Sequence, residues 1–73
     1  MAYALRAVRE KPMSARQEKR VHELIERYHD YDHYYGKTDT EVEIVVHDGS
    51  ATMAASEFRA CGFVVGGEQM QTP

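Results

Sequence analysis

Three histidines and a glutamate recur at a helical spacing in the first half of the chain. His22, Glu26, His29 and His33 follow one another at intervals of four, three and four residues, so an α-helix would carry them on one flank. Imidazole and carboxylate groups at this spacing can converge on one metal ion. However, Glu26 stands where the metalloprotease pattern H-E-x-x-H requires a second histidine. We therefore favour a hydrated helix flank over a metal site, and we expect no cofactor.

The same stretch contains four tyrosines within eight residues, namely Tyr28, Tyr31, Tyr34 and Tyr35. On a helix, the first, second and fourth would join the apolar face and enter the core, whereas Tyr34 would point outward among carboxylates. Exposed tyrosine is a frequent anchor at protein interfaces because it offers a large contact area with little loss of rotamer freedom. We predict an acidic protein-binding face on this helix that consists of Glu26, Asp30, Asp32, His33 and Tyr34.

Charge is distributed unevenly along the 73 residues, whose net charge is −3. Most of the first twenty residues' charges are basic, and the rest of the chain is strongly acidic. Arg16, Lys19 and Arg20 gather at the start of the predicted helix, where backbone amides also attract anions. They are candidate contacts for an anionic partner, and a nucleic-acid-associated regulator is our second hypothesis. The acidic balance and the lack of a recognisable nucleic-acid-binding motif make it the weaker one.

Several classes of function are improbable from the sequence. The only cysteine, Cys61, lies among apolar residues in "FRACGFVV", which is typical of a buried, inert thiol in a reducing compartment. No glycine-rich phosphate loop or paired nucleophile and base is recognisable, and a chain this small rarely encloses a substrate pocket. The longest uncharged apolar run is too short to cross a membrane. We expect a cytoplasmic protein without catalytic activity and without a membrane partner.

The pattern of elements predicts a small α+β fold. Residues 2–8 and 41–47 alternate as strands do, and a long helix begins after the capping pair Ser14 and Gln17 and ends at Gly36 at the latest. Asp48 and Gly49 indicate a hairpin with a return strand over 50–54. A short helix would follow from Ser56 to Gly62, and residues 63–65 would add a fourth strand. We predict one domain over 1–66, with one long helix on a small antiparallel sheet, and a flexible C-terminal tail over 67–73.

These features together favour a small non-enzymatic interaction protein that binds a larger protein or nucleoprotein complex. Stand-alone proteins of this kind are often phage or mobile-element accessory factors, which inhibit or redirect a host nucleic-acid-handling machine. Sheet edges that one helix leaves open can also pair with a second copy, so a homodimer through the sheet edge is a further expectation. A metal-binding module built on the histidine stripe is the third hypothesis.

Overall fold

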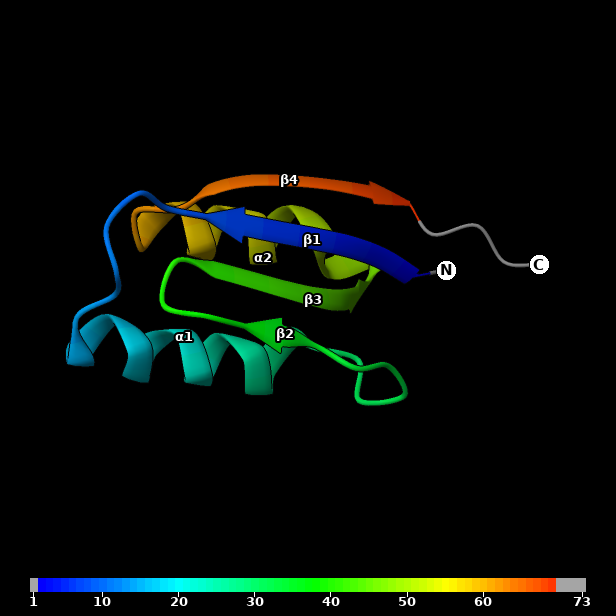
Figure 1. The fold of residues 1–73 in the computed structure, drawn as a ribbon. Coiled ribbons are helices and arrows are strands. Elements are labelled where there is room, and N and C mark those ends of the chain that lie inside the picture. The colour runs from blue at the N-terminus through cyan, green and yellow to red at the C-terminus, as the bar shows by residue number, and fades with distance from the viewer. Residues whose placement is uncertain (1, 70–73) are drawn as a thin grey trace.

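The computed structural model describes residues 2 to 69 as an α+β fold, as the sequence predicts (Figure 1). The elements in chain order are β1 (Ala2–Val8), α1 (Ala15–Tyr28), β2 (Gly36–Lys37), β3 (Glu41–His47), the 3-10 turn η1 (Asp48–Ser50), α2 (Ala51–Ala60) and β4 (Val64–Gln69). The four strands form one antiparallel sheet in the order β2-β3-β1-β4. Neither described helix is long and apolar enough to cross a bilayer.

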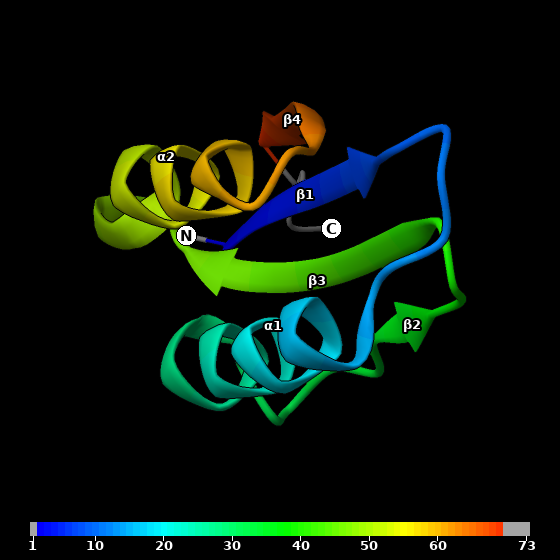
Figure 2. The same cartoon turned by 90° about the vertical axis from the view of Figure 1, so that its left-hand side faces the viewer.

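Both helices pack on the same face of the sheet, and the core lies between the two layers (Figure 2). Alternate residues of the two central strands point toward the helices, as strand geometry requires. The buried residues of the strands are Leu5, Ala7, Val42, Ile44 and Val46, and those of the helices are Val21, Leu24, Ile25, Ala54, Ala55 and Phe58. The other face of the sheet has no covering layer within the described residues.

Helix α1 begins as predicted and ends at Tyr28, well before Gly36, the latest end that the sequence allows. The Ser14 hydroxyl accepts a hydrogen bond from the Gln17 amide at 3.2 Å, and the Ser14 amide donates to the Gln17 side chain at 2.9 Å, which completes the capping box. The helix stops at Tyr28, because the backbone of His29 turns to an extended conformation. Residues up to Gly36 are therefore not helical.

This early end changes the positions of the tyrosines. Tyr28 is half-buried against the core, whereas the side chains of Tyr31 and Tyr35 are 63% and 44% exposed. Our prediction that these two tyrosines enter the core is wrong, because the helical phase on which it depended does not extend to them. The prediction that Tyr34 is exposed is confirmed, since its side chain is fully accessible.

The hairpin predicted at Asp48 and Gly49 does not form. Neither residue has the positive φ that a type I′ turn needs, and the chain instead passes through η1 directly into α2. The predicted return strand over 50–54 and the helix start at Ser56 are therefore wrong. Alanine-rich residues 51–60 favour a helix, and Ala54, Ala55 and Phe58 form its buried face. Gly62 follows α2 with a φ of 89°, in agreement with the predicted helix stop.

Strand β4 is longer than the predicted strand over 63–65. It runs from Val64 to Gln69, so residues 67–69 of the expected tail pair with β1. Residues 70–73 of that tail lie outside the described part. A Cβ at Gly67 would stand 2.6 Å from Tyr3 Cε1 and 2.7 Å from the Ala4 carbonyl oxygen, whereas a Cβ at Gly66 would meet nothing within 4 Å. Only glycine therefore fits at position 67 without a shift of its neighbours.

Candidate protein-binding site

The segment between α1 and β2 forms a compact exposed loop, which we call the tyrosine loop (residues 30–35). Asp30 organises it: its amide donates to the Val45 carbonyl at 2.7 Å, and its carboxylate accepts from the Asp32 amide at 3.0 Å. The His33 amide closes the turn onto the Asp30 carbonyl at 3.0 Å, and His33 Nδ1 lies 3.5 Å from the same carboxylate. The loop is thus tied to β3 at its start and braced by one aspartate.

His29 connects the tyrosine loop to the sheet. Its side chain is 5% exposed, and its Nδ1 accepts a hydrogen bond from the Val45 amide at 3.2 Å. An amide N–H can only donate, so Nδ1 carries no proton and Nε2 is the protonated nitrogen that donates to the His33 carbonyl at 2.8 Å. The ring also meets the rings of Tyr31 and Tyr35 edge-on, each with a centroid separation of 5.1 Å. His29 is therefore a structural hub with both nitrogens in use.

The predicted histidine stripe does not form. It assumed a helix through position 33, whereas α1 ends at Tyr28. His22 and Glu26 remain exposed on the helix, His33 lies in the tyrosine loop, and His29 turns inward. Among residues 2 to 69 no three His, Cys, Asp or Glu side chains are grouped so that they could hold a metal ion.

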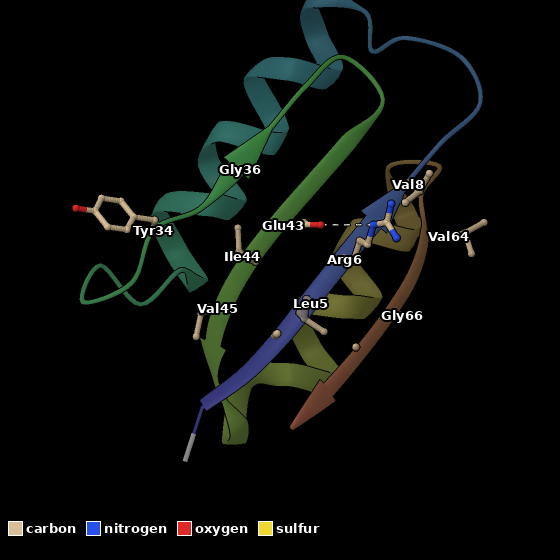
Figure 3. Close-up of a pocket in the computed structure, with 12 residues that line it drawn as sticks. Leu5, Arg6, Val8, Tyr34, Gly36, Glu43, Ile44, Val45, Val64 and Gly66 are labelled. Carbon is tan, nitrogen blue, oxygen red and sulfur yellow. Dashed lines mark ion pairs between the residues drawn. The ribbon is translucent and has the colours of Figure 1, made fainter. Parts of the chain in front are cut away.

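Four of the five residues predicted for protein binding belong to the tyrosine loop rather than to a helix face. Asp32, His33 and Tyr34 are exposed there, and Tyr34 projects away from the sheet (Figure 3). The fourth, Asp30, is engaged in holding the loop. Glu26 is exposed on the last turns of α1. The single helix face that we predicted is therefore replaced by a loop, and the exposed Tyr31 is a further contact candidate that helical periodicity concealed.

A shallow groove of about 640 Å³ adjoins the loop on the uncovered face of the sheet (Figure 3). Arg6 and Glu43 line the groove, and Arg6 Nε lies 3.5 Å from Glu43 Oε1. Arg6 Nε also lies 2.7 Å from Oε1 of Glu41, which completes an ion-pair cluster. The hydrogen bond from Arg6 is the main cause that lowers the pKa of Glu41 below its usual value of 4.5. The exposed side chains of Val8 and Val64 flank the cluster, and Tyr34 stands at its opposite rim. The sequence pattern gives no signal for this groove, because the pairing of Arg6 with Glu41 and Glu43 depends on the register of two strands that are far apart in the chain.

Fewer of the basic residues near the N-terminus are free to contact an anionic partner than their number suggests. Arg16 and Lys19 are exposed on α1, but Arg20 donates to Glu23 and to Glu57 of α2, both at 3.3 Å. Two other cations of this segment are also engaged within the molecule. Arg6 pairs across the sheet, and the Arg9 guanidinium donates to the Cys61 carbonyl and lies over the Phe63 ring.

No protein-family model, curated protein or solved structure matches this chain. Two features stand out from its geometry: an exposed aromatic and acidic loop held by a buried histidine, and an adjoining groove with paired charges.

Proposed function

We propose that this chain is a non-enzymatic interaction protein that binds a basic surface of a larger protein or nucleoprotein complex through the tyrosine loop. The observation that carries the proposal is the full exposure of Tyr34 on a loop that the rest of the fold holds in place. The hydrogen bonds of His29 and Asp30 fix the loop before any partner arrives. A preorganised loop loses little conformational entropy on binding, so more of the contact energy is available as affinity.

The charges around Tyr34 favour a basic partner. Asp32 is exposed beside it, Glu43 is 60% exposed in the adjoining groove, and Glu26 is exposed on α1. Opposite charge on a partner would steer the encounter and raise the association rate, and this contribution would weaken with salt. Arg6 is shared between Glu41 and Glu43, so the cluster keeps one net negative charge. The exposed side chains of Val8 and Val64 in the same groove offer an apolar surface to aliphatic parts of a partner.

Binding of this kind suits a protein that blocks a site rather than one that transforms a substrate. A small acidic protein that covers a basic protein surface competes with the nucleic acid for which that surface is normally used. We therefore propose that the chain inhibits or redirects a nucleic-acid-handling machine, in the manner of a phage or mobile-element accessory factor. A nucleic-acid-associated regulator is the second candidate, and exposed Arg16 and Lys19 are the observation in its favour.

Site-specific photo-crosslinking in an extract of the source cells tests both candidates. A benzoylphenylalanine would replace Tyr34 in the tyrosine loop, Arg16 at the start of α1, or Met53 on the exposed side of α2. Met53, which is 65% exposed, is the control for non-specific contact. The proposal predicts discrete protein adducts from position 34 that are absent from position 53 and that decrease as salt is raised.

The pattern of adducts distinguishes the alternatives. Nuclease-sensitive adducts from position 16, without protein adducts from position 34, would replace the proposal with the nucleic-acid hypothesis. Identical protein adducts from positions 34 and 53 would contradict a specific role for the tyrosine loop, since the two positions lie on different elements.

A further inference from the structure

The two edges of the sheet differ in how many of their backbone hydrogen-bonding groups are paired. On the β2 side, β3 is covered along its length, because β2 pairs with Glu43 and Val42, and His29 and Asp30 bond the amide and carbonyl of Val45. On the other side, β4 is an edge strand, and its sequence VVGGEQ contains no lysine, arginine or proline. Natural edge strands usually carry such residues to prevent pairing with another chain. β4 is therefore the edge of this sheet that remains available for pairing.

The outward backbone groups of β4 belong to Val65 and Gly67. The Arg9 amide donates to the Thr40 carbonyl, one step beyond the pair of Val8 with Glu41, so every second residue of β1 counted from Arg9 bonds to β3. The residues between them, Arg6 and Val8, bond to β4, and the β4 residues that are not opposite these two face away. The Val65 carbonyl accepts from Arg59 Nη2 at 3.3 Å, and the Gly67 carbonyl accepts from the Tyr3 hydroxyl at 3.3 Å. Both bonds are long and exposed, and none of the described side chains accepts from the two outward amides. An incoming strand would therefore meet two free donors and two weakly held acceptors.

A groove of about 410 Å³ runs beside this edge, between β4 and α2. Opposite charges stand at its two ends. Arg59 lies at the start of β4, where it reaches Val65. Asp48 follows β3 at the end of the sheet where Ala2 pairs with His47, which is the end toward which β4 runs. Both side chains line the groove, and neither forms an ion pair with an oppositely charged Lys, Arg, Asp or Glu in the described part of the chain.

We propose that β4 pairs with β4 of a second copy of this chain, antiparallel about a two-fold axis at Gly66. Side chains that share a face must stand opposite one another, and this register meets that requirement by placing Val65 opposite Gly67 of the second copy. Each such hydrogen-bonded pair exchanges two N–H···O bonds, and the symmetry makes two of them. A Cβ at Gly66 would meet nothing within 4 Å, so none of the described side chains covers the position of the axis.

Charge complementarity is what favours a second copy over an unrelated strand. Antiparallel pairing reverses the groove of the second copy, so Arg59 of each copy comes to the end where Asp48 of the other lies. A two-fold interface makes this contact twice. The β4 edge is the opposite edge of the sheet from β2 and the tyrosine loop, so the dimer leaves the proposed protein-binding site free.

Native mass spectrometry and sedimentation over a range of micromolar concentrations test the proposal. Wild-type protein is expected to dimerise, and Arg59→Asp or Asp48→Arg alone is expected to weaken the dimer by about tenfold or more, since each leaves like charges in contact. The double variant Arg59→Asp with Asp48→Arg restores opposite charges and should recover the dimer. Arg16→Asp is the matched control, because it reverses a charge on α1 and should leave dimerisation unchanged. Circular dichroism is the control that each variant is folded.

Three outcomes would overturn the proposal. The first is a wild-type protein that stays monomeric over the whole concentration range. The second is a dimer that both single variants leave unchanged, which would place the interface elsewhere. The third is a folded double variant that does not recover the dimer, which would contradict the register. None of these outcomes bears on crosslinking from the tyrosine loop, so failure of this inference and failure of the proposed function are distinguishable.

Discussion

Replacing His29 with alanine should destabilise the fold more than any exposed substitution near it. The change leaves the amide of Val45 without its acceptor, which costs about 1–3 kcal/mol, and removes the bond to the His33 carbonyl, worth about 0.5–1.5 kcal/mol. The total is about 3 kcal/mol, a large part of the roughly 4–11 kcal/mol expected for a chain of 73 residues. Thermal unfolding followed by circular dichroism should show a midpoint lower by about 12–24 °C.

Asparagine and glutamine at position 29 separate the two hydrogen bonds. The Asn oxygen can take the place of Nδ1 and keep the bond from Val45, whereas the Gln amide can take the place of Nε2 and keep only the bond to His33. We expect the Asn variant to be the more stable of the two. Water can hydrate the His33 carbonyl in the exposed loop when its hydrogen bond is lost, whereas water reaches the Val45 amide of β3 less easily. A Gln variant as stable as wild type, or more stable than the Asn variant, would refute the role assigned to Nδ1.

Two further predictions concern the sheet. Gly67→Ala should destabilise the monomer by about 1–3 kcal/mol, because the added Cβ meets backbone and ring atoms. Gly66→Ala should be neutral or stabilise the monomer by about 0.5 kcal/mol, because its Cβ meets nothing. Equal urea midpoints of the two variants, at a concentration where the chain is monomeric, would contradict this. The pKa of Glu41 is lowered by Arg6, so its stabilising effect is present above 4.5 and is lost as pH falls through the lower folded value. Arg6→Gln should return the pKa of Glu41, measured by carbon NMR, toward 4.5, and an unchanged value would contradict the pairing.

The elements that local patterns determine could be predicted from the sequence. Strands over 2–8 and 41–47 follow from alternation, and the start of α1 follows from Ser14 and Gln17, whose side chains act within one turn. The stop at Gly62 likewise needs only one residue able to take a positive φ. In each case the decisive interactions connect residues that are close in sequence.

The errors arise where a distant contact decides the structure. The end of α1 depends on the hydrogen bond between His29 and Val45, sixteen residues later, which no helical pattern contains. Because the sequence pattern does not reveal this contact, the predicted helix extends too far. That extension places His29 and His33 in a stripe, and Tyr31 and Tyr35 in the core, where the structure does not have them. The prediction at Asp48 and Gly49 failed for another reason. Packing of Ala54, Ala55 and Phe58 on the sheet stabilises α2 more than a hairpin would stabilise this segment.

The structure also changes which variants test the protein-binding site. Asp30 bonds within the tyrosine loop and to β3, so its replacement would disturb the loop itself. Asp32 accepts no hydrogen bond through its side chain from the described residues, and Asp39, an exposed aspartate in the turn before β3, makes a matched control. Charge reversal at either position changes the net charge equally.

The most direct measurement is the yield of protein adducts from a photo-crosslinker at position 34 in the Asp32→Lys and Asp39→Lys backgrounds. If the tyrosine loop docks on a basic protein surface, Asp32→Lys reduces the adducts severalfold and Asp39→Lys leaves them close to the level of the parent protein. Equal yields in the two backgrounds, with both variants folded, would contradict the central claim that the acidic tyrosine loop is the binding site.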